Sequence, residues 1–376
     1  MTSTNETSKI KVSIYGPVAS GKTVFLTSLF HHILWDNSCG DFNIIGMNEK
    51  MSKLHEDMIK GKWPKPTPFH DDKERFVYKY KNKIYEIVSL SGEKTYDGKT
   101  FNVTEIINEY KNSGSKVFIG VINPFFVDSD LAYDCFLNLI AYIQMAAKNN
   151  GLLLSIAESC KLAAKAMFSY SFQDFDNTPS LEENQKEFLY ETKLQFYYTK
   201  QDVEDIKKRV ENNKKTDLKS YLKYEPDNQD EKDEIFKILK LFIKNLFDSN
   251  QIQYGLFRSI LREIPDDSKK IIILSYYDIR AFMGYITDKH FEPVFEKIVN
   301  DIRQPKRNRF YFEYIRTEIV LSESDDESDR IRPKEFRVSR QFMNALLEII
   351  SFKENWLSIL QQKAKRFISF ISRDRS

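Results

Sequence analysis

The segment between residues 10 and 23, IKVSIYGPVASGKT, combines the residue types that bind phosphate groups. Gly16, Gly21, Lys22 and Thr23 follow the spacing G-x-x-x-x-G-K-[ST]. The glycines let successive backbone amides point at phosphate oxygens, and a helix start adds its positive end. Lys22 is expected to reach the β- and γ-phosphates, and the Thr23 hydroxyl to hold Mg²⁺. The candidate phosphate-binding residues are Gly16, Pro17, Val18, Ala19, Ser20, Gly21, Lys22, Thr23 and Val24.

The elements on both sides of this segment agree with that interpretation. Ile10, Val12 and Ile14 alternate with less apolar residues, which predicts a strand that ends near Tyr15. An apolar periodic stretch from about Lys22 to Trp35 predicts a helix. The sequence therefore predicts a strand, a glycine-bounded loop and a helix in succession.

Further strands are expected along the chain. Residues 74–80 and 84–90 flank a polar turn and predict a hairpin. Residues 117–122 and 271–274 are nearly all apolar, which is typical of strands covered on both faces in a parallel sheet. Residues 309–320 predict one more strand. These features indicate an α/β fold with a mostly parallel central sheet between helical layers.

Helical periodicity fills residues 131–147 and 152–168 and returns near the end of the chain. Between the strands expected at 117–122 and 271–274 the chain becomes charged and rich in asparagine, which predicts a largely helical insertion. Such an insertion is either a surface elaboration or a lid or partner-docking module. The predicted parts are a disordered polar leader at 1–9, a core at 10–149 and 266–350, the insertion at 150–265, and a terminal helix at 338–376 whose second half could dock a partner.

Composition narrows the expected environment and partners. The 376 residues include 57 Lys plus Arg and 55 Asp plus Glu, so the formal net charge is only +2, and no nucleic-acid partner is expected. No apolar run is long enough to span a membrane, which makes a cytoplasmic protein the default expectation. Cys39, Cys135 and Cys160 are scattered, and the five histidines lack metal-ligand spacing, so no metal held by protein alone is expected.

The order of these elements resembles the Ras-like core of translation-factor-class GTPases, which are P-loop NTPases with a three-layer sandwich fold. The stretch GKWPKPTPF at 61–69 stands where the first switch would lie. It looks like the G-x-W-P-x-x-T stretch of bacterial GTPases of conflict-associated or double-GTPase type. The resemblance implies that Thr67 completes the Mg²⁺ shell and senses the γ-phosphate. The prolines are equally compatible with a rigid surface loop.

The family pattern D-x-x-G falls at the end of the second hairpin strand, on Ser89, Leu90, Ser91 and Gly92. The resemblance implies that the Gly92 amide binds the γ-phosphate and that Glu93 orients the attacking water. Serine cannot supply a carboxylate to the Mg²⁺ shell, which puts metal affinity and hydrolysis in question. The alternative is a polar loop that only follows a strand.

The guanine-selecting pattern N-K-x-D of the family would fall on the residues after 271–274, where only Asp278 matches. A carboxylate there accepts two hydrogen bonds from guanine that adenine cannot donate. Tyr276 is placed to stack on the base. Asp278 could instead cap the helix that follows.

These features lead to a principal hypothesis and two alternatives. The principal hypothesis is a GTP-binding, GTP-hydrolysing switch that uses Mg²⁺, cycles between GTP and GDP, and controls a protein partner. The first alternative is a nucleotide-stabilised scaffold with little turnover, or a P-loop protein that uses ATP. The second is phosphotransfer to a small molecule with Arg303, Arg307 and Arg309 as lid cations, although a solvated basic loop is the simpler interpretation of those arginines.

Overall fold

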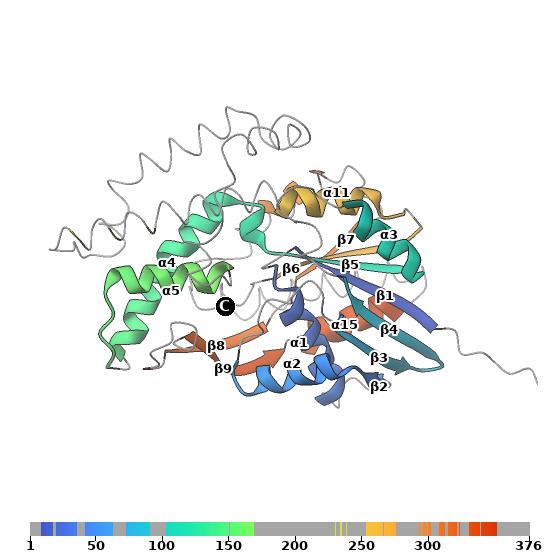
Figure 1. Cartoon of the computed structure of the whole chain (residues 1–376), viewed down its shortest axis with the longest axis horizontal. Helices are drawn as coiled ribbons and strands as arrows, with labels where there is room; N and C mark the ends of the chain where they lie inside the picture. Colours follow the sequence, from blue (N-terminus) through green and yellow to red (C-terminus); the bar gives the residue numbers. More distant parts are fainter. Residues whose placement is uncertain are drawn as a thin grey trace, which may run out of the picture.

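The computed structural model shows an α/β protein in which helices cover both faces of a central sheet (Figure 1). Among the described helices, none is both long enough and apolar enough to cross a membrane. The described residues are 9–17, 20–35, 42–62, 73–90, 103–149, 151–168, 230, 234, 238, 253–265, 267–275, 293–294, 296–298, 300–301, 308–312, 315–321, 323, 331–338 and 340–351.

The central sheet has seven strands in the order β2-β3-β4-β1-β5-β6-β7. Strands β4, β1, β5, β6 and β7 run parallel, and β3 is antiparallel to both of its neighbours. The predicted α/β class with a mostly parallel sheet is therefore confirmed, and the carboxyl ends of the parallel strands meet at one edge. The bounds are β1 Lys9–Tyr15, β2 Phe42–Met47, β3 Arg75–Tyr80, β4 Lys83–Ser89, β5 Val117–Ile122, β6 Lys269–Leu274 and β7 Asn308–Phe312.

The composition of each strand matches its place in the sheet. All residues of β5, VFIGVI, are buried, as are the last five of β6, KKIIIL, because helices cover both faces of these central strands. In β3, RFVYKY, fully buried and more accessible residues alternate over the first four positions, in keeping with a place nearer the sheet margin. The hairpin between β3 and β4 turns at Lys81, which has a positive φ of 52°.

Two hydrophobic clusters divide the core, one on each face of the sheet. On one face, α1 (Lys22–Trp35) and α15 (Arg340–Ser351) pack over β1, β5 and β6. On the other face, α3 (Val103–Ser113) and α11 (Gly255–Glu263) pack on the same strands. Figure 1 shows these pairs on opposite sides of the sheet. Both α1 and α15 lie directly on the sheet, since Tyr85 of β4 and Lys269 of β6 donate hydrogen bonds to carbonyls of α15.

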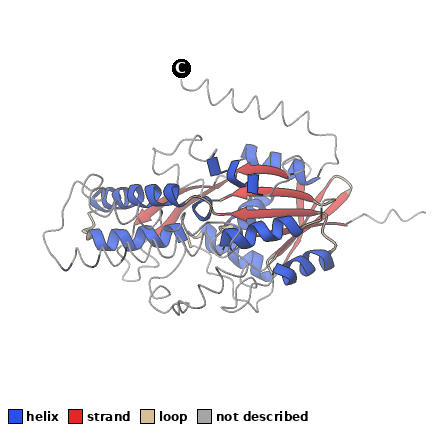
Figure 2. Ribbon diagram, turned by 90° about the horizontal axis from the view of Figure 1, so that it is seen from above, coloured by secondary structure: helices blue, strands red, loops and turns tan. Residues whose placement is uncertain are grey.

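Helices α4 (Ser129–Asn149) and α5 (Ile156–Phe168) follow β5 and pack against each other. A short 3₁₀ helix, η3 (Pro124–Phe126), joins β5 to α4. In both views this helix pair projects beyond one end of the sheet (Figure 2). A second sheet consists of the antiparallel strands β8 (Ile315–Leu321) and β9 (Ile331–Val338).

Two sequence expectations were wrong in detail. The sequence interpretation assigned no helix or strand between Trp35 and the hairpin, but this region contains β2 and an additional helix, α2 (Glu49–Ile59). The glycine and asparagine in FNIIGM, together with a register shift between Ile44 and Gly46, obscure the strand pattern of β2. The single strand expected at 309–320 is two strands, since β7 pairs with β6 whereas β8 pairs with β9. Neither glycine nor proline marks the break between them.

Candidate phosphate-binding site

The glycine-bounded loop connects the carboxyl end of β1 to the start of α1, as the sequence predicts. Gly21 has a φ of 81°, a left-handed conformation that glycine adopts without steric cost. The Ser20 amide donates to the Pro17 carbonyl at 3.1 Å, and the Phe25 amide donates to the Gly21 carbonyl at 2.9 Å. The chain therefore turns tightly before Lys22 begins the helix.

Gly16 shows how little space this turn leaves. A Cβ atom at residue 16 would overlap Ser20 Oγ and lie 2.7 Å from the Val121 carbonyl oxygen on β5. The carbonyl is part of the sheet and cannot move aside like a flexible side chain. Glycine at this position thus allows the loop to fold back against the edge of the sheet.

Ser20 lies inside the loop with its side chain almost fully buried, at 1% exposure. Its hydroxyl has no hydrogen-bond partner among the described residues. Its backbone carbonyl accepts a hydrogen bond from Ser275 Oγ, which also donates to the Ile122 carbonyl at 3.3 Å. Buried hydroxyls normally have partners, so the Ser20 hydroxyl is a donor that suits an anion in the loop.

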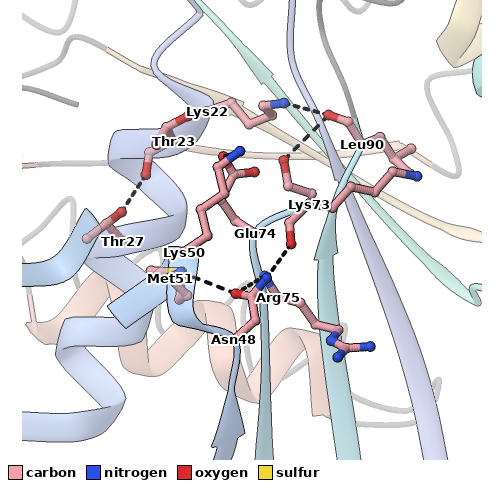
Figure 3. Close-up of polar contacts among 11 residues, drawn as sticks. Lys22, Thr23, Thr27, Asn48, Lys50, Met51, Lys73, Glu74, Arg75 and Leu90 are labelled. Atoms are coloured by element: carbon pink, nitrogen blue, oxygen red, sulfur yellow. Dashed lines mark hydrogen bonds and ion pairs between the residues drawn. The ribbon is translucent and has the colours of Figure 1, made fainter. Parts of the chain in front are cut away.

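Lys22 is the first residue of α1 and is buried, at 9% exposure. Its ammonium donates to the Leu90 carbonyl at 2.5 Å, so the side chain crosses the end of β1 and reaches the end of β4 (Figure 3). The Leu90 amide in turn donates to the Ile14 carbonyl at 2.7 Å. The ammonium therefore lies at the carboxyl edge of the sheet, which is where the sequence predicts the phosphate-binding site.

Thr23 follows Lys22 in the first turn of α1 and is partly exposed. Its carbonyl accepts a hydrogen bond from Thr27 Oγ1 at 2.8 Å. Three groups at this helix start fit a phosphate anion together: the Ser20 hydroxyl, the Lys22 ammonium and the backbone amides of the turn. In the first turn of α1, the Thr23 side chain supplies a hydroxyl that could bind Mg²⁺.

Ser89 ends β4 beside this loop and is buried, at 2% exposure. Its amide donates to the Glu74 carbonyl at 3.0 Å, and its hydroxyl lies 3.5 Å from the Leu90 carbonyl. Leu90 contacts Lys22, and Ser89 is the residue before it. The remaining predicted site residues lie outside the described residues: Val18, Ala19, Thr67, Gly92, Glu93, Tyr276 and Asp278.

The structure adds residues from β3 and α2 that the sequence interpretation did not include. Glu74 precedes β3 and is 1% exposed, and its carboxylate lies 3.5 Å from the Lys50 ammonium. Asn48 caps α2 by accepting from the Met51 amide at 3.2 Å, and it donates to the Lys73 carbonyl at 2.6 Å. Asparagine before a helix start was a usable signal for the cap.

Few protein side chains could act as metal ligands in the described part of the chain. Within the described ranges, no group of three or more histidine, cysteine, aspartate or glutamate residues lies together. A divalent cation at the helix start would therefore take part of its oxygen ligands from phosphate and water, which is the usual manner of binding Mg²⁺.

Comparison with known proteins adds no relative. No protein-family model matches the sequence, and neither the curated proteins nor the solved structures gave a significant match.

Proposed function

We propose that the chain is a GTP-binding, GTP-hydrolysing molecular switch with a three-layer P-loop NTPase core. The observation that carries the proposal is the turn between β1 and α1 at the carboxyl edge of the sheet. It contains the Lys22 ammonium and a buried Ser20 hydroxyl that has no hydrogen-bond partner within the described ranges. Ligands of α/β proteins bind at this edge of the sheet. The tight packing around Gly16 supports the same interpretation.

Each residue of the turn has a defined part in this proposal. The amides of Gly21, Lys22, Thr23 and Val24 and the Ser20 hydroxyl bind phosphate oxygens, with the helix start contributing its positive end. Pro17 has no amide hydrogen, and the Ser20 amide already donates to the Pro17 carbonyl. Lys22 exchanges its bond to the Leu90 carbonyl for the β- and γ-phosphates. Thr23 holds the Mg²⁺, whose contribution is to neutralise charge on the phosphates.

The switch itself depends on residues outside the described ranges. In this proposal Thr67 and Gly92 sense the γ-phosphate, and Glu93 orients the water. Asp278 selects guanine while Tyr276 stacks on the base. Loss of the γ-phosphate then releases both loops and changes what a protein partner can bind.

The test is the affinity for GTP, GDP and ATP, measured with the full chain and with Lys22→Ala. Hydrogen bonds to charged groups contribute about 1.5–3 kcal/mol, so Lys22→Ala should weaken GTP binding about 10- to 100-fold. Lys269→Ala is a matched control, because Lys269 also donates to a backbone carbonyl, that of Ile349, at 2.6 Å. It should leave GTP affinity unchanged.

Two results would count against the proposal. Absence of nucleotide binding would remove the function altogether. A preference for ATP over GTP of about tenfold or more would remove the assignment of Asp278 to guanine while leaving the phosphate site in place.

A nucleotide-stabilised scaffold with little hydrolysis is the second candidate. It is favoured by Ser89, which ends β4 with a hydroxyl where the resembling GTPases have a carboxylate. A phosphate-release assay separates the two candidates. Turnover that is lost in both Lys22→Ala and Glu93→Ala would exclude the scaffold, whereas tight GTP binding without phosphate release would establish it.

A further inference from the structure

Glu74 places a carboxylate at the same edge of the sheet as the glycine-bounded loop. Strand β3 is antiparallel to β4, so its first residues lie beside the last residues of β4. The Glu74 carbonyl accepts the Ser89 amide at 3.0 Å, and the next residue, Leu90, accepts the Lys22 ammonium. Glu74 therefore lies at the start of the strand next to β4, and Leu90, which follows β4, contacts Lys22.

The burial of Glu74 is unusual for a carboxylate. The residue is 1% exposed, and a buried charge is costly unless opposite charge and hydrogen bonds compensate it. The ammonium of Lys50 lies 3.5 Å away, in the first turn of α2. Figure 3 shows the side chains of Glu74, which precedes β3, and of Lys50 in α2 pointing toward the start of α1, where Lys22 and Thr23 are located.

The two residues that flank Glu74 each form an ion pair with another carboxylate. Lys73, the residue before Glu74, forms its ion pair with Glu109. Arg75, the residue after it, contacts Glu86 at 3.7 Å. The Glu74 carboxylate is paired with Lys50, and Figure 3 draws it on the side of Lys22 and Thr23.

We propose that Glu74 is the carboxylate that binds the divalent cation accompanying the nucleotide, from the strand next to the one that ends in Ser89. This inference rests on the proposed function. Mg²⁺ in nucleotide sites is bound by one or two carboxylates, phosphate oxygens and water. Ser89 has no charge to offer, while Glu74 lies beside it. Without a cation, Lys50 neutralises the carboxylate.

The test measures the free Mg²⁺ concentration that gives half-maximal binding of fluorescent GTP, together with GTP affinity in EDTA. Glu74→Gln should raise the required Mg²⁺ concentration about 10- to 100-fold, the usual effect of losing a residue that supports a metal. Its GTP affinity in EDTA should equal that of the unchanged protein.

Two controls separate cation binding from a purely structural ion pair. Glu86→Gln alters a second buried carboxylate of the same hairpin, which is 6% exposed and lies 2.9 Å from Lys9. It should not change the Mg²⁺ requirement. Lys50→Gln removes the partner of Glu74 but keeps the carboxylate, so it should not raise the requirement either.

The outcomes are distinct. A folded Glu74→Gln protein with an unchanged Mg²⁺ requirement overturns the role of Glu74 and leaves the proposed function intact. Equal increases in Glu74→Gln and Lys50→Gln assign the effect to the ion pair and also overturn it. Failure of the unchanged protein to bind GTP overturns both proposals. If Glu74→Gln does not fold, the double variant Lys50→Gln/Glu74→Gln removes the unpaired charge and takes its place in the same titration.

Discussion

Gly16 and Gly120 lie side by side in the fold, and both occupy positions where a Cβ atom has no room. Gly120 is in β5 and pairs with Tyr15 of β1, the residue that precedes Gly16. At Gly120 a Cβ would lie 2.8 Å from the Phe257 ring of α11. At Gly16 it would meet the Ser20 hydroxyl and the Val121 carbonyl.

The two positions differ in what surrounds them. Phe257 is fully buried in the core on the α11 face, and its ring stacks near Tyr15 with centroids 6.4 Å apart. Gly120 therefore serves packing between helix and sheet. The two nearest neighbours of Gly16 are polar atoms, the Ser20 hydroxyl and the Val121 carbonyl, at the edge of the sheet where the loop turns. A side chain added at Gly120 should therefore lower stability alone, whereas one added at Gly16 should also weaken ligand binding.

The largest expected effect concerns the packing of α11 on the sheet next to Gly120. Phe257→Ala removes a fully buried ring and should lower the free energy of unfolding by about 3–5 kcal/mol, measured by urea denaturation. GTP affinity of the folded protein should stay the same, because α11 covers the face opposite α1. A large loss of affinity with little loss of stability would make this face part of the site.

Gly120→Ala should destabilise the protein by about 1–3 kcal/mol, because the added methyl group overlaps a ring that cannot move freely. Combining it with Phe257→Leu should recover part of the loss, since the two changes share one contact. Additive losses in the double variant would contradict this account.

Gly16→Ala makes the same chemical change on the loop side. The new methyl group must displace either Ser20 or the loop from the Val121 carbonyl, and the amides that we propose bind phosphate move with the loop. With a distortion of about 1–3 kcal/mol, we expect GTP affinity to fall about tenfold by titration. Gly120→Ala is the matched control, and an equal loss of affinity in both variants would remove the distinction between the two glycines.

The sequence correctly predicted the elements that a short run of neighbouring residues is enough to indicate. The apolar runs of β5 and β6 and the glycine spacing before Lys22 each indicate their structure within a few residues, because burial on both faces and tight turning restrict residue types strongly. The contacts of Glu74 were not predictable in this way. Its position depends on the pairing of β3 with β4 and on Lys50 in a helix that the sequence pattern did not reveal.

The smallest expected effect concerns the far end of α1. Burial lowers the pKa of His31 from 6.5 to about 4, and the nearby charges of His55 and His32 contribute in the same direction. The unfolded chain therefore binds more protons than the folded chain between these pH values, so the free energy of unfolding should fall as the pH falls from 6.5 to about 4.

His31→Gln should make that decline shallower in urea denaturation at several pH values. The decline will not vanish, because burial also lowers the pKa of His55, whose Nε2 lies 2.9 Å from His31 Nδ1. GTP affinity measured at pH 7 should be the same in His31→Gln and in the unchanged protein, since the substitution lies at the end of α1 away from Lys22. A marked change in affinity would show that packing near the end of α1 is coupled to the loop at its start, and would contradict a role of His31 in stability alone.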